Sequence, residues 1–277
     1  MCIYAKMSQK EKGRGNMISI KLVDKDGNTV FFGRGEEKVD LAICREYQPG
    51  DMFWIECSEE KGYLWLQVDD ALGQSLVYYT GILKYVIPFE EKRVNLSPKA
   101  FSGNLHLARL RVAKDFEIDA YRNLAFNVND QPQNESFYPH ATANVETRGE
   151  AVFAAQNAID GNTANESHGK WPYESWGINR NKDAAMKINF GREVEIDRII
   201  VFLRADFPHD NWWKEIKITF SDGEELKMGL KKTMNGQELM IEPKKITWLE
   251  VSELIQSDEQ SPFPALSQIE VYGKGRC

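Results

Sequence analysis

Short stretches that alternate apolar and polar residues recur along most of this chain, about every ten residues, with turn sequences between them. In one such stretch, Phe53, Ile55 and Cys57 alternate with Trp54 and Glu56. A period of two residues is what a β-strand with one buried face requires. The sequence has no apolar stripe of helical period over the length of a helix. We therefore predict an all-β fold.

Two series of such stretches divide the chain, whose 277 residues are enough for two domains. The first series comprises 18–23, 29–32, 39–43, 52–57, 63–68, 75–79, 82–87, 105–112 and 117–122. The second comprises 186–190, 195–204, 215–220, 224–230, 237–242, 245–251 and 267–272, preceded by a short helix or turn at 151–158 and a long loop region at 166–184. Regular short strands with turn signals are typical of antiparallel β-sandwiches.

The boundary between the two series is predicted at 123–136, which is rich in Asn, Asp and Gln, a composition typical of a linker. We predict a disordered tail at 1–16, an N-terminal β-sandwich domain at 17–130 and a C-terminal domain at 131–277. Both domains are expected to be jelly-roll-like sandwiches. Because the linker is short, the domains are expected to touch.

Charge and hydropathy exclude several classes of function. The formal net charge is −7 and no basic patch stands out, so we expect no nucleic-acid partner. No apolar run reaches the roughly 18 residues of a membrane-spanning helix, and no signal peptide is recognised. We expect a cytoplasmic protein, or a secreted one if the true N-terminus differs; a homo-oligomer is compatible with these features. The four cysteines indicate no disulfide framework, and Cys44 and Cys57 are expected in the core.

The segment 157–165 combines oxygen-bearing side chains with a turn. Asp160 offers a carboxylate, Asn162 and Asn165 offer amide oxygens, and Gly161 lets the backbone curl around one point. A hard cation such as Ca²⁺ requires this kind of ligand set. Asp-Gly-Asn is also an ordinary turn sequence, so a simple turn remains the alternative.

Five motifs in the second half occur in the order of a known family. They are Ala158-Ile159-Asp160-Gly161-Asn162, Ile188-Asn189-Phe190-Gly191, the strand 199–204, Phe220-Ser221-Asp222-Gly223 and Ile269-Glu270-Val271-Tyr272-Gly273. Together they resemble the coagulation-factor type C (discoidin-like) domain and, within it, the family 32 carbohydrate-binding modules. The resemblance covers about 137–273. It implies a galactose-binding-like sandwich for the C-terminal domain.

The resemblance also implies a structural calcium ion. Its expected ligands are the carboxylates of Asp160 and Glu270, with carbonyl or side-chain oxygens from Asn157, Asn162, Asn165 and Ile269. The family usually has Thr or Ser where Asn165 stands, although an amide oxygen can replace a hydroxyl.

In this family the sugar lies at one end of the sandwich, where loops present an aromatic ring and polar groups. The residues that this implies are His168, Trp171, Arg204, Asp206, His209, Asp210, Asn211, Trp212 and Phe263. Arg and His donate hydrogen bonds to hydroxyls, Asp and Asn accept them, and Trp stacks on the C–H face of a sugar. For several of them a structural role is the alternative, and Trp176 and Trp213 are expected in the core.

The leading hypothesis is therefore a non-catalytic protein whose partner is a carbohydrate or glycan. A hydrolase or lyase that uses Asp206, His209 and Asp210 is an alternative, but the sequence has no recognised nucleophile motif. A third possibility is a module for adhesion to a protein or a membrane, because discoidin-like domains can also bind through exposed apolar loop tips. The sequence does not indicate which sugar would bind.

Overall fold

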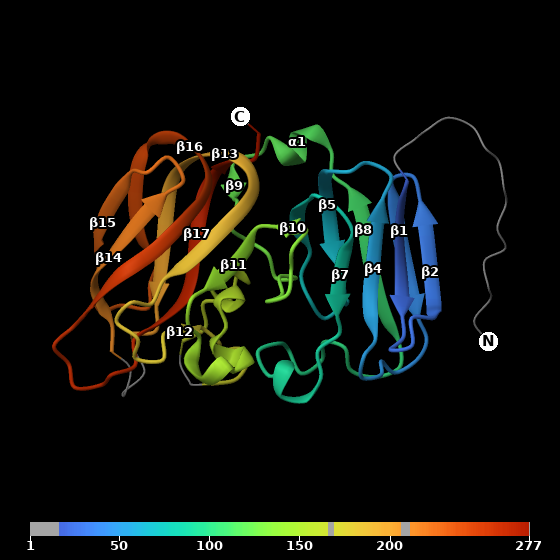
Figure 1. Cartoon of the computed structure of the whole chain (residues 1–277), viewed down its shortest axis with the longest axis horizontal. Helices are drawn as coiled ribbons and strands as arrows, with labels where there is room; N and C mark the ends of the chain where they lie inside the picture. The colour runs from blue at the N-terminus through green and yellow to red at the C-terminus, as the bar shows by residue number, and fades with distance from the viewer. Residues whose placement is uncertain (1–16, 166–168, 206–210, 277) are drawn as a thin grey trace.

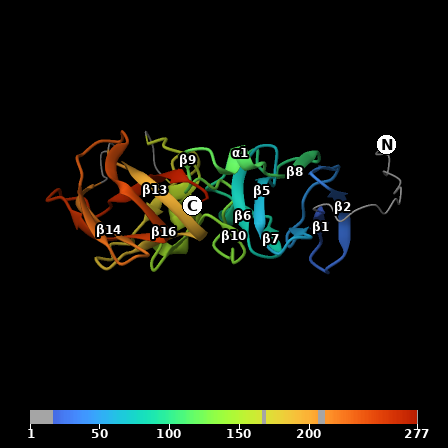
Figure 2. The ribbon, with the colours of Figure 1, turned by 90° about the horizontal axis from the view of Figure 1, so that it is seen from above.

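The computed structural model describes residues 17–165, 169–205 and 211–276, so the predicted tail at 1–16 lies outside the described residues. The molecule is elongated, with two groups of strands side by side and the segment from α1 to β11 between them (Figures 1 and 2). The fold is almost entirely antiparallel β-sheet, which confirms the all-β prediction. Within the described residues no helix is both long and apolar enough to span a membrane.

The N-terminal strands form two sheets around one hydrophobic core. Ile20, Phe53 and Leu66 are fully buried in that core. The first sheet has the order β2-β1-β4-β7, with bounds Thr29–Gly35, Ile18–Val23, Met52–Cys57 and Leu83–Val86. The second has the order β10-β6-β5-β8-β3, with bounds Phe137–Tyr138, Ser75–Tyr79, Gly62–Gln67, His106–Val112 and Lys38–Ile43. The alternating burial of β3 and β4 shows that one face of each sheet covers the core.

The C-terminal strands form one large sheet that surrounds a second core, in which Trp176 and Trp213 pack 6.2 Å apart as expected. The order is β12-β17-β13-β16-β14-β15, with bounds Trp176–Gly177, Ala265–Lys274, Met186–Leu203, Gln237–Gln256, Trp213–Phe220 and Glu225–Gly229. β11 (His140–Ala143) pairs with β13, and β9 (Arg122–Asn123) pairs with β17. Register shifts in β13 and β16 join pairs of strands that were predicted as separate.

The chain crosses between the two groups of strands three times, from β8 to β9, from β9 to β10 and from β10 to β11. β9 belongs to the C-terminal sheet, whereas β10, which follows it, belongs to the N-terminal sheet. Several polar side chains between them are buried: Asn129 Nδ2 donates to the Leu66 carbonyl at 3.1 Å, and Gln131 bonds both the amide and the carbonyl of Val86. This segment is therefore an ordered polar connection that belongs to both groups, and not an exposed linker. The division into two domains stays a prediction.

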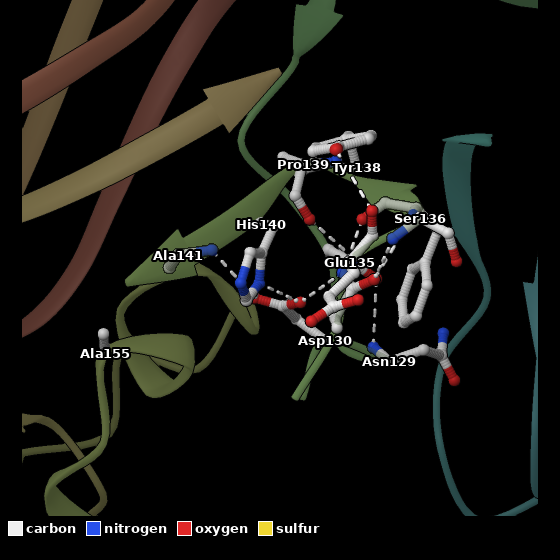
Figure 3. Close-up of polar contacts among 12 residues, drawn as sticks. Asn129, Asp130, Glu135, Ser136, Tyr138, Pro139, His140, Ala141 and Ala155 are labelled. Carbon is white, nitrogen blue, oxygen red and sulfur yellow. Dashed lines mark hydrogen bonds and ion pairs between the residues drawn. The ribbon is translucent and has the colours of Figure 1, made fainter. Parts of the chain in front are cut away.

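Asp130 is the centre of this connection (Figure 3). Its carboxylate accepts hydrogen bonds from His140 Nδ1 at 2.8 Å, from the Ala141 amide at 2.9 Å and from Asn134 Nδ2 at 3.1 Å. Asp130, Asn134 and His140 are all buried. These bonds fix the start of β11 against the connecting segment.

Helices are few and short. They are η1 (Glu90–Lys92), α1 (Asp115–Ile118), η2 (Thr147–Gly149), η3 (Ala151–Phe153) and η4 (Ala155–Ile159). The strand predicted at 117–122 is wrong, because Glu117 accepts from the Lys114 amide at 2.8 Å and from Arg111, which stabilises a helical turn there. The core position predicted for Cys44 is also wrong: Cys44 follows the last buried residue of β3 and is exposed, while Cys57 is half-buried.

Candidate functional site

A pocket of about 120 Å³ opens at one end of the C-terminal sandwich. It is formed where the end of β13 meets the loops that precede β12, follow β12 and precede β17. The lining residues are Thr147, Arg148, Phe153, Ser175, Gly177, Ile178, Asn179, Arg180, Arg204, Pro262, Phe263, Pro264 and Ala265. Concave sites lined by apolar walls and a few polar groups are typical of small-ligand binding.

An exposed aromatic ring forms one wall. Phe263 is 43% exposed, and the Arg180 guanidinium carbon lies 4.6 Å from the centre of its ring. A cation at this distance is attracted by the face of the ring and restricts how the side chain turns. Phe263 and Arg180 together therefore present an aromatic surface and several N–H donors at the pocket.

The turn that carries Arg180 is shaped by local constraints. A Cβ at Gly177 would lie 2.6 Å from Thr147 Oγ1, so only glycine lets these loops approach. The Asn179 amide donates to Thr147 Oγ1 at 3.0 Å. Asn179 and Arg180 both have positive φ, of 49° and 58°. Such a backbone is tolerated only where its surroundings hold it, which is common at ligand sites.

The floor of the pocket is polar and buried. Ser175 is fully buried, and among the described residues its Oγ has no hydrogen-bond partner. Arg204 is also buried, and its guanidinium donates to the carbonyl of Tyr173, which holds the loop before β12 against the end of β13. A buried hydroxyl without a partner is costly unless a water or ligand satisfies it.

The structure brings together two of the predicted sugar-binding residues, Arg204 and Phe263. Trp171 is 42% exposed but does not line the pocket; its amide donates to the Val94 carbonyl at 2.9 Å, which links its loop to the N-terminal half. His168, Asp206, His209 and Asp210 lie outside the described residues.

Asn211 and Trp212 shape a neighbouring loop instead of facing the pocket. Asn211 is fully buried, and its amide donates to the carbonyls of Glu259 and Ser261, at 3.0 and 2.6 Å. Trp212 Nε1 donates to Glu259 Oε1 at 3.1 Å, and the ring packs on the C-terminal core. The amide hydrogens of Asn211 fix the loop that leads to Phe263, and its role as a ligand contact stays a prediction.

The predicted cation loop contains a pair of carboxylates. The Asn162 amide donates to Asp160 Oδ1 at 2.8 Å, and Asn162 Nδ2 donates to Glu174 Oε1 at 2.7 Å. Burial and then the charge of Glu174 raise the pKa of Asp160 well above its usual range. Burial also raises the pKa of Glu174. Glu174 is buried and Asp160 is partly buried, and two neighbouring carboxylates in such surroundings need a shared proton or a cation to be stable.

Two oxygens near the same turn also lack partners. Glu174 Oε2 and Asn165 Oδ1 are buried, and neither has a hydrogen-bond partner among the described residues. Carboxylate and amide oxygens are the ligands that Ca²⁺ takes in proteins, so this donor set fits a calcium ion. Glu174 was missed by sequence reasoning, because it lies outside the Asp-Gly-Asn segment and meets it only in the fold.

Three other expected calcium ligands, Asn157, Glu270 and Ile269, make contacts away from the Asp160–Glu174 pair. Asn157 Oδ1 accepts from Asn95 Nδ2 at 2.9 Å, a buried contact between the two halves of the chain. Glu270 Oε2 accepts from the Tyr272 hydroxyl at 3.0 Å, and Ile269 is buried in the core. The β17 side chain that bonds the turn is Gln268, whose Oε1 accepts from the Gly161 amide at 3.2 Å.

Comparisons with solved structures return sugar-binding modules, although no family model and no curated protein matches the chain. The chitosan-binding module 1 of a chitosanase/glucanase from Paenibacillus sp. IK-5 has a TM-score of 0.37 and 18% identity, over 55% of this chain and 98% of that one. The family 32 module of C. perfringens NanJ, solved with galactose, has a TM-score of 0.37 and 17% identity, over 48% and 91%. The lectin domain of lectinolysin, complexed with Lewis B antigen, has a TM-score of 0.38 and 15% identity, over 55% and 96%.

Proposed function

We propose that this chain is a non-catalytic carbohydrate-binding protein and that the sugar lies in the pocket at the end of the C-terminal sandwich. The observation that carries the proposal is the exposed ring of Phe263, which Arg180 contacts in the same pocket as the buried hydroxyl of Ser175, for which residues 17–165, 169–205 and 211–276 supply no hydrogen-bond partner. A sugar has an apolar C–H face and a rim of hydroxyls, and this pocket offers a surface for each.

Each wall of the pocket has a distinct part in the proposed recognition. The Phe263 ring packs against the C–H face, which removes apolar surface from water. Arg180 donates hydrogen bonds to hydroxyl or ring oxygens. Ser175 Oγ can both donate and accept, so a sugar hydroxyl, directly or through a water molecule, would satisfy it. Arg204 positions the loop through Tyr173.

We also propose that a structural calcium ion binds beside Asp160 and Glu174, with Asn165 Oδ1 as a further ligand. The support is the pair of neighbouring carboxylates, together with the oxygens of Glu174 and Asn165 that have no hydrogen-bond partner among the described residues. Bound calcium would neutralise the carboxylates. Tyr173 and Ser175 flank Glu174, so the ion would also hold the loop that shapes the pocket floor.

The test is a panel of immobilised neutral glycans probed with the full chain. We expect the wild type to bind a subset of them, and Arg180→Ala to lose most of that signal. Arg34→Ala, at an exposed arginine of β2 in the N-terminal half, is the matched control and should bind like the wild type. Binding of no glycan, or equal binding by Arg180→Ala, would count against the proposal.

A further inference from the structure

Two aspartates and a histidine meet in the N-terminal half of the chain. Asp69 and Asp70 follow β5, and His106 begins β8, the strand that pairs with β5. One ligand atom from each of the three side chains lies within 4.8 Å of the others. In the part of the chain that the structure describes, no other three His, Cys, Asp or Glu side chains form such a group.

The two ring nitrogens of His106 have different partners. Nε2 lies 2.9 Å from the carbonyl oxygen of Gly103, and a carbonyl can only accept, so Nε2 must donate. Nδ1 faces Asp69 Oδ2 at 3.2 Å, so an ion bound between these two atoms would be held by one nitrogen and one carboxylate oxygen. Histidines that bind metals usually donate their other N–H to a backbone carbonyl or a carboxylate in this way.

The group is buried on one side and open on the other. Asp69 and His106 are only 1% and 3% exposed, and Asp69 Oδ1 accepts from the Ala71 amide at 2.9 Å. Asp70 is exposed, and its Oδ1 accepts from the Leu107 amide at 3.1 Å. A bound ion could therefore complete its coordination with water on the side of Asp70.

A buried tyrosine hydroxyl belongs to the side chain that packs on His106. The ring of Tyr47 lies 4.2 Å from the ring of His106, and its hydroxyl is buried without a partner among the described residues. A water molecule on a bound ion would give this hydroxyl a partner.

We propose that Asp69, Asp70 and His106 bind a divalent transition-metal ion, Zn²⁺ in preference to Ca²⁺. Zinc takes imidazole and carboxylate ligands, whereas calcium takes oxygen ligands. Bonds of about 2.1 Å in a tetrahedral site place neighbouring ligand atoms about 3.4 Å apart. The Nδ1–Oδ2 distance of 3.2 Å already matches this spacing. The ion would fasten the loop after β5 to the start of β8.

The test is calorimetric titration of the EDTA-treated, dialysed full chain with ZnCl₂. Asp70→Asn removes an exposed ligand without disturbing the buried pair, and we expect it to weaken zinc binding at least tenfold. Asp26→Asn, in an exposed turn of the same half, is the matched control, and Asp160→Asn tests the proposed calcium site. Both should bind zinc like the wild type. A wild-type chain that binds no zinc, or equal binding by Asp70→Asn, would overturn the proposal.

A second measurement locates the ion. Long-range ¹H–¹⁵N spectra of the imidazoles are simple to assign because the chain has four histidines. Zinc should shift the Nδ1 resonance of His106 and leave Nε2 protonated. If zinc leaves both nitrogens of His106 unchanged, the metal does not bind there and the proposal fails.

Discussion

Asp130→Ala is expected to destabilise the protein more strongly than any surface substitution. The carboxylate of Asp130 accepts hydrogen bonds from His140 Nδ1, the Ala141 amide and Asn134 Nδ2, all in buried surroundings (Figure 3). Alanine cannot accept any of them, and the buried position gives water little access to replace them. The connection between the two groups of strands would lose its central acceptor.

The magnitude follows from what each donor retains. Asn134 Nδ2 keeps its bond to the Phe137 carbonyl, so the His140 ring nitrogen and the Ala141 amide are the donors that lose their acceptor. A buried donor left unsatisfied costs about 1–3 kcal/mol, so for the two donors we expect a loss of about 2–6 kcal/mol in the free energy of unfolding. Whole domains are stable by only about 5–15 kcal/mol, so this loss is large.

The assay is urea unfolding followed by tryptophan fluorescence. Glu135→Ala changes an exposed carboxylate in the same segment and is the matched control, with an expected change within about 0.5 kcal/mol. If Asp130→Ala were also within about 0.5 kcal/mol of the wild type, the polar connection would not have the structural role assigned to it.

Three further predictions concern pH, metal and backbone. Burial, the largest influence, lowers the pKa of His140, but the hydrogen bond and charge of Asp130 outweigh it and raise that pKa above its ordinary value. The stabilisation from this pair is therefore full below about pH 6.5 and is lost as the pH rises through the folded pKa. The difference in unfolding free energy between wild type and Asp130→Ala should shrink from about pH 6 to about pH 9, and a constant difference would contradict this. Calcium should raise the melting temperature of the wild type but not of Asp160→Asn; an equal rise in both would exclude Asp160 as a ligand. Gly191→Ala should lower the melting temperature more than Gly223→Ala. Both glycines have positive φ, but of the two only Gly191 lies where an added Cβ would collide with another residue, the ring of Tyr138. Equal effects of the two substitutions in a thermal melt would refute the steric argument.

The strands were predictable where burial alternates regularly. The range 52–57 coincides with β4, where burial alternates over most of the strand and imposes the two-residue period on the sequence. The range 75–79 coincides with β6, which is buried over nearly its whole length and was marked by its short apolar run. The bend in β13 was interpreted as a turn between two strands. Gly191 does have positive φ there, but the backbone stays within the sheet on both sides of it. A sequence pattern marks such a break in geometry without showing whether the pairing continues.

The polar connection could not be recognised from composition. Asn129, Asp130 and Gln131 are the residue types that fill exposed linkers, yet here they are buried and bonded to backbone groups of both halves. Whether a polar side chain is exposed or satisfied inside a protein depends on partners distant in the sequence.

Only part of the candidate site could be predicted, because the site also depends on residues that are distant in the sequence. The family motifs pointed to Arg204 and to the aromatic residue Phe263, which the pocket contains. Ser175 and Arg180 lie in the long loop region that was noted as irregular, but no motif distinguished them. They become candidates only because the fold brings the loop after β12 against the loop before β17.

Sugar binding at Phe263 is tested most directly by isothermal titration of the strongest glycan from the panel into wild type, Phe263→Ala and Phe116→Ala. Phe116 lies on α1 and is 71% exposed, so its variant controls for loss of an exposed aromatic ring elsewhere. Loss of an aromatic stacking contact of about 1.4 kcal/mol weakens binding about tenfold. We predict that Phe263→Ala binds at least about tenfold more weakly while Phe116→Ala binds like the wild type. Equal affinity of all three proteins would contradict the account.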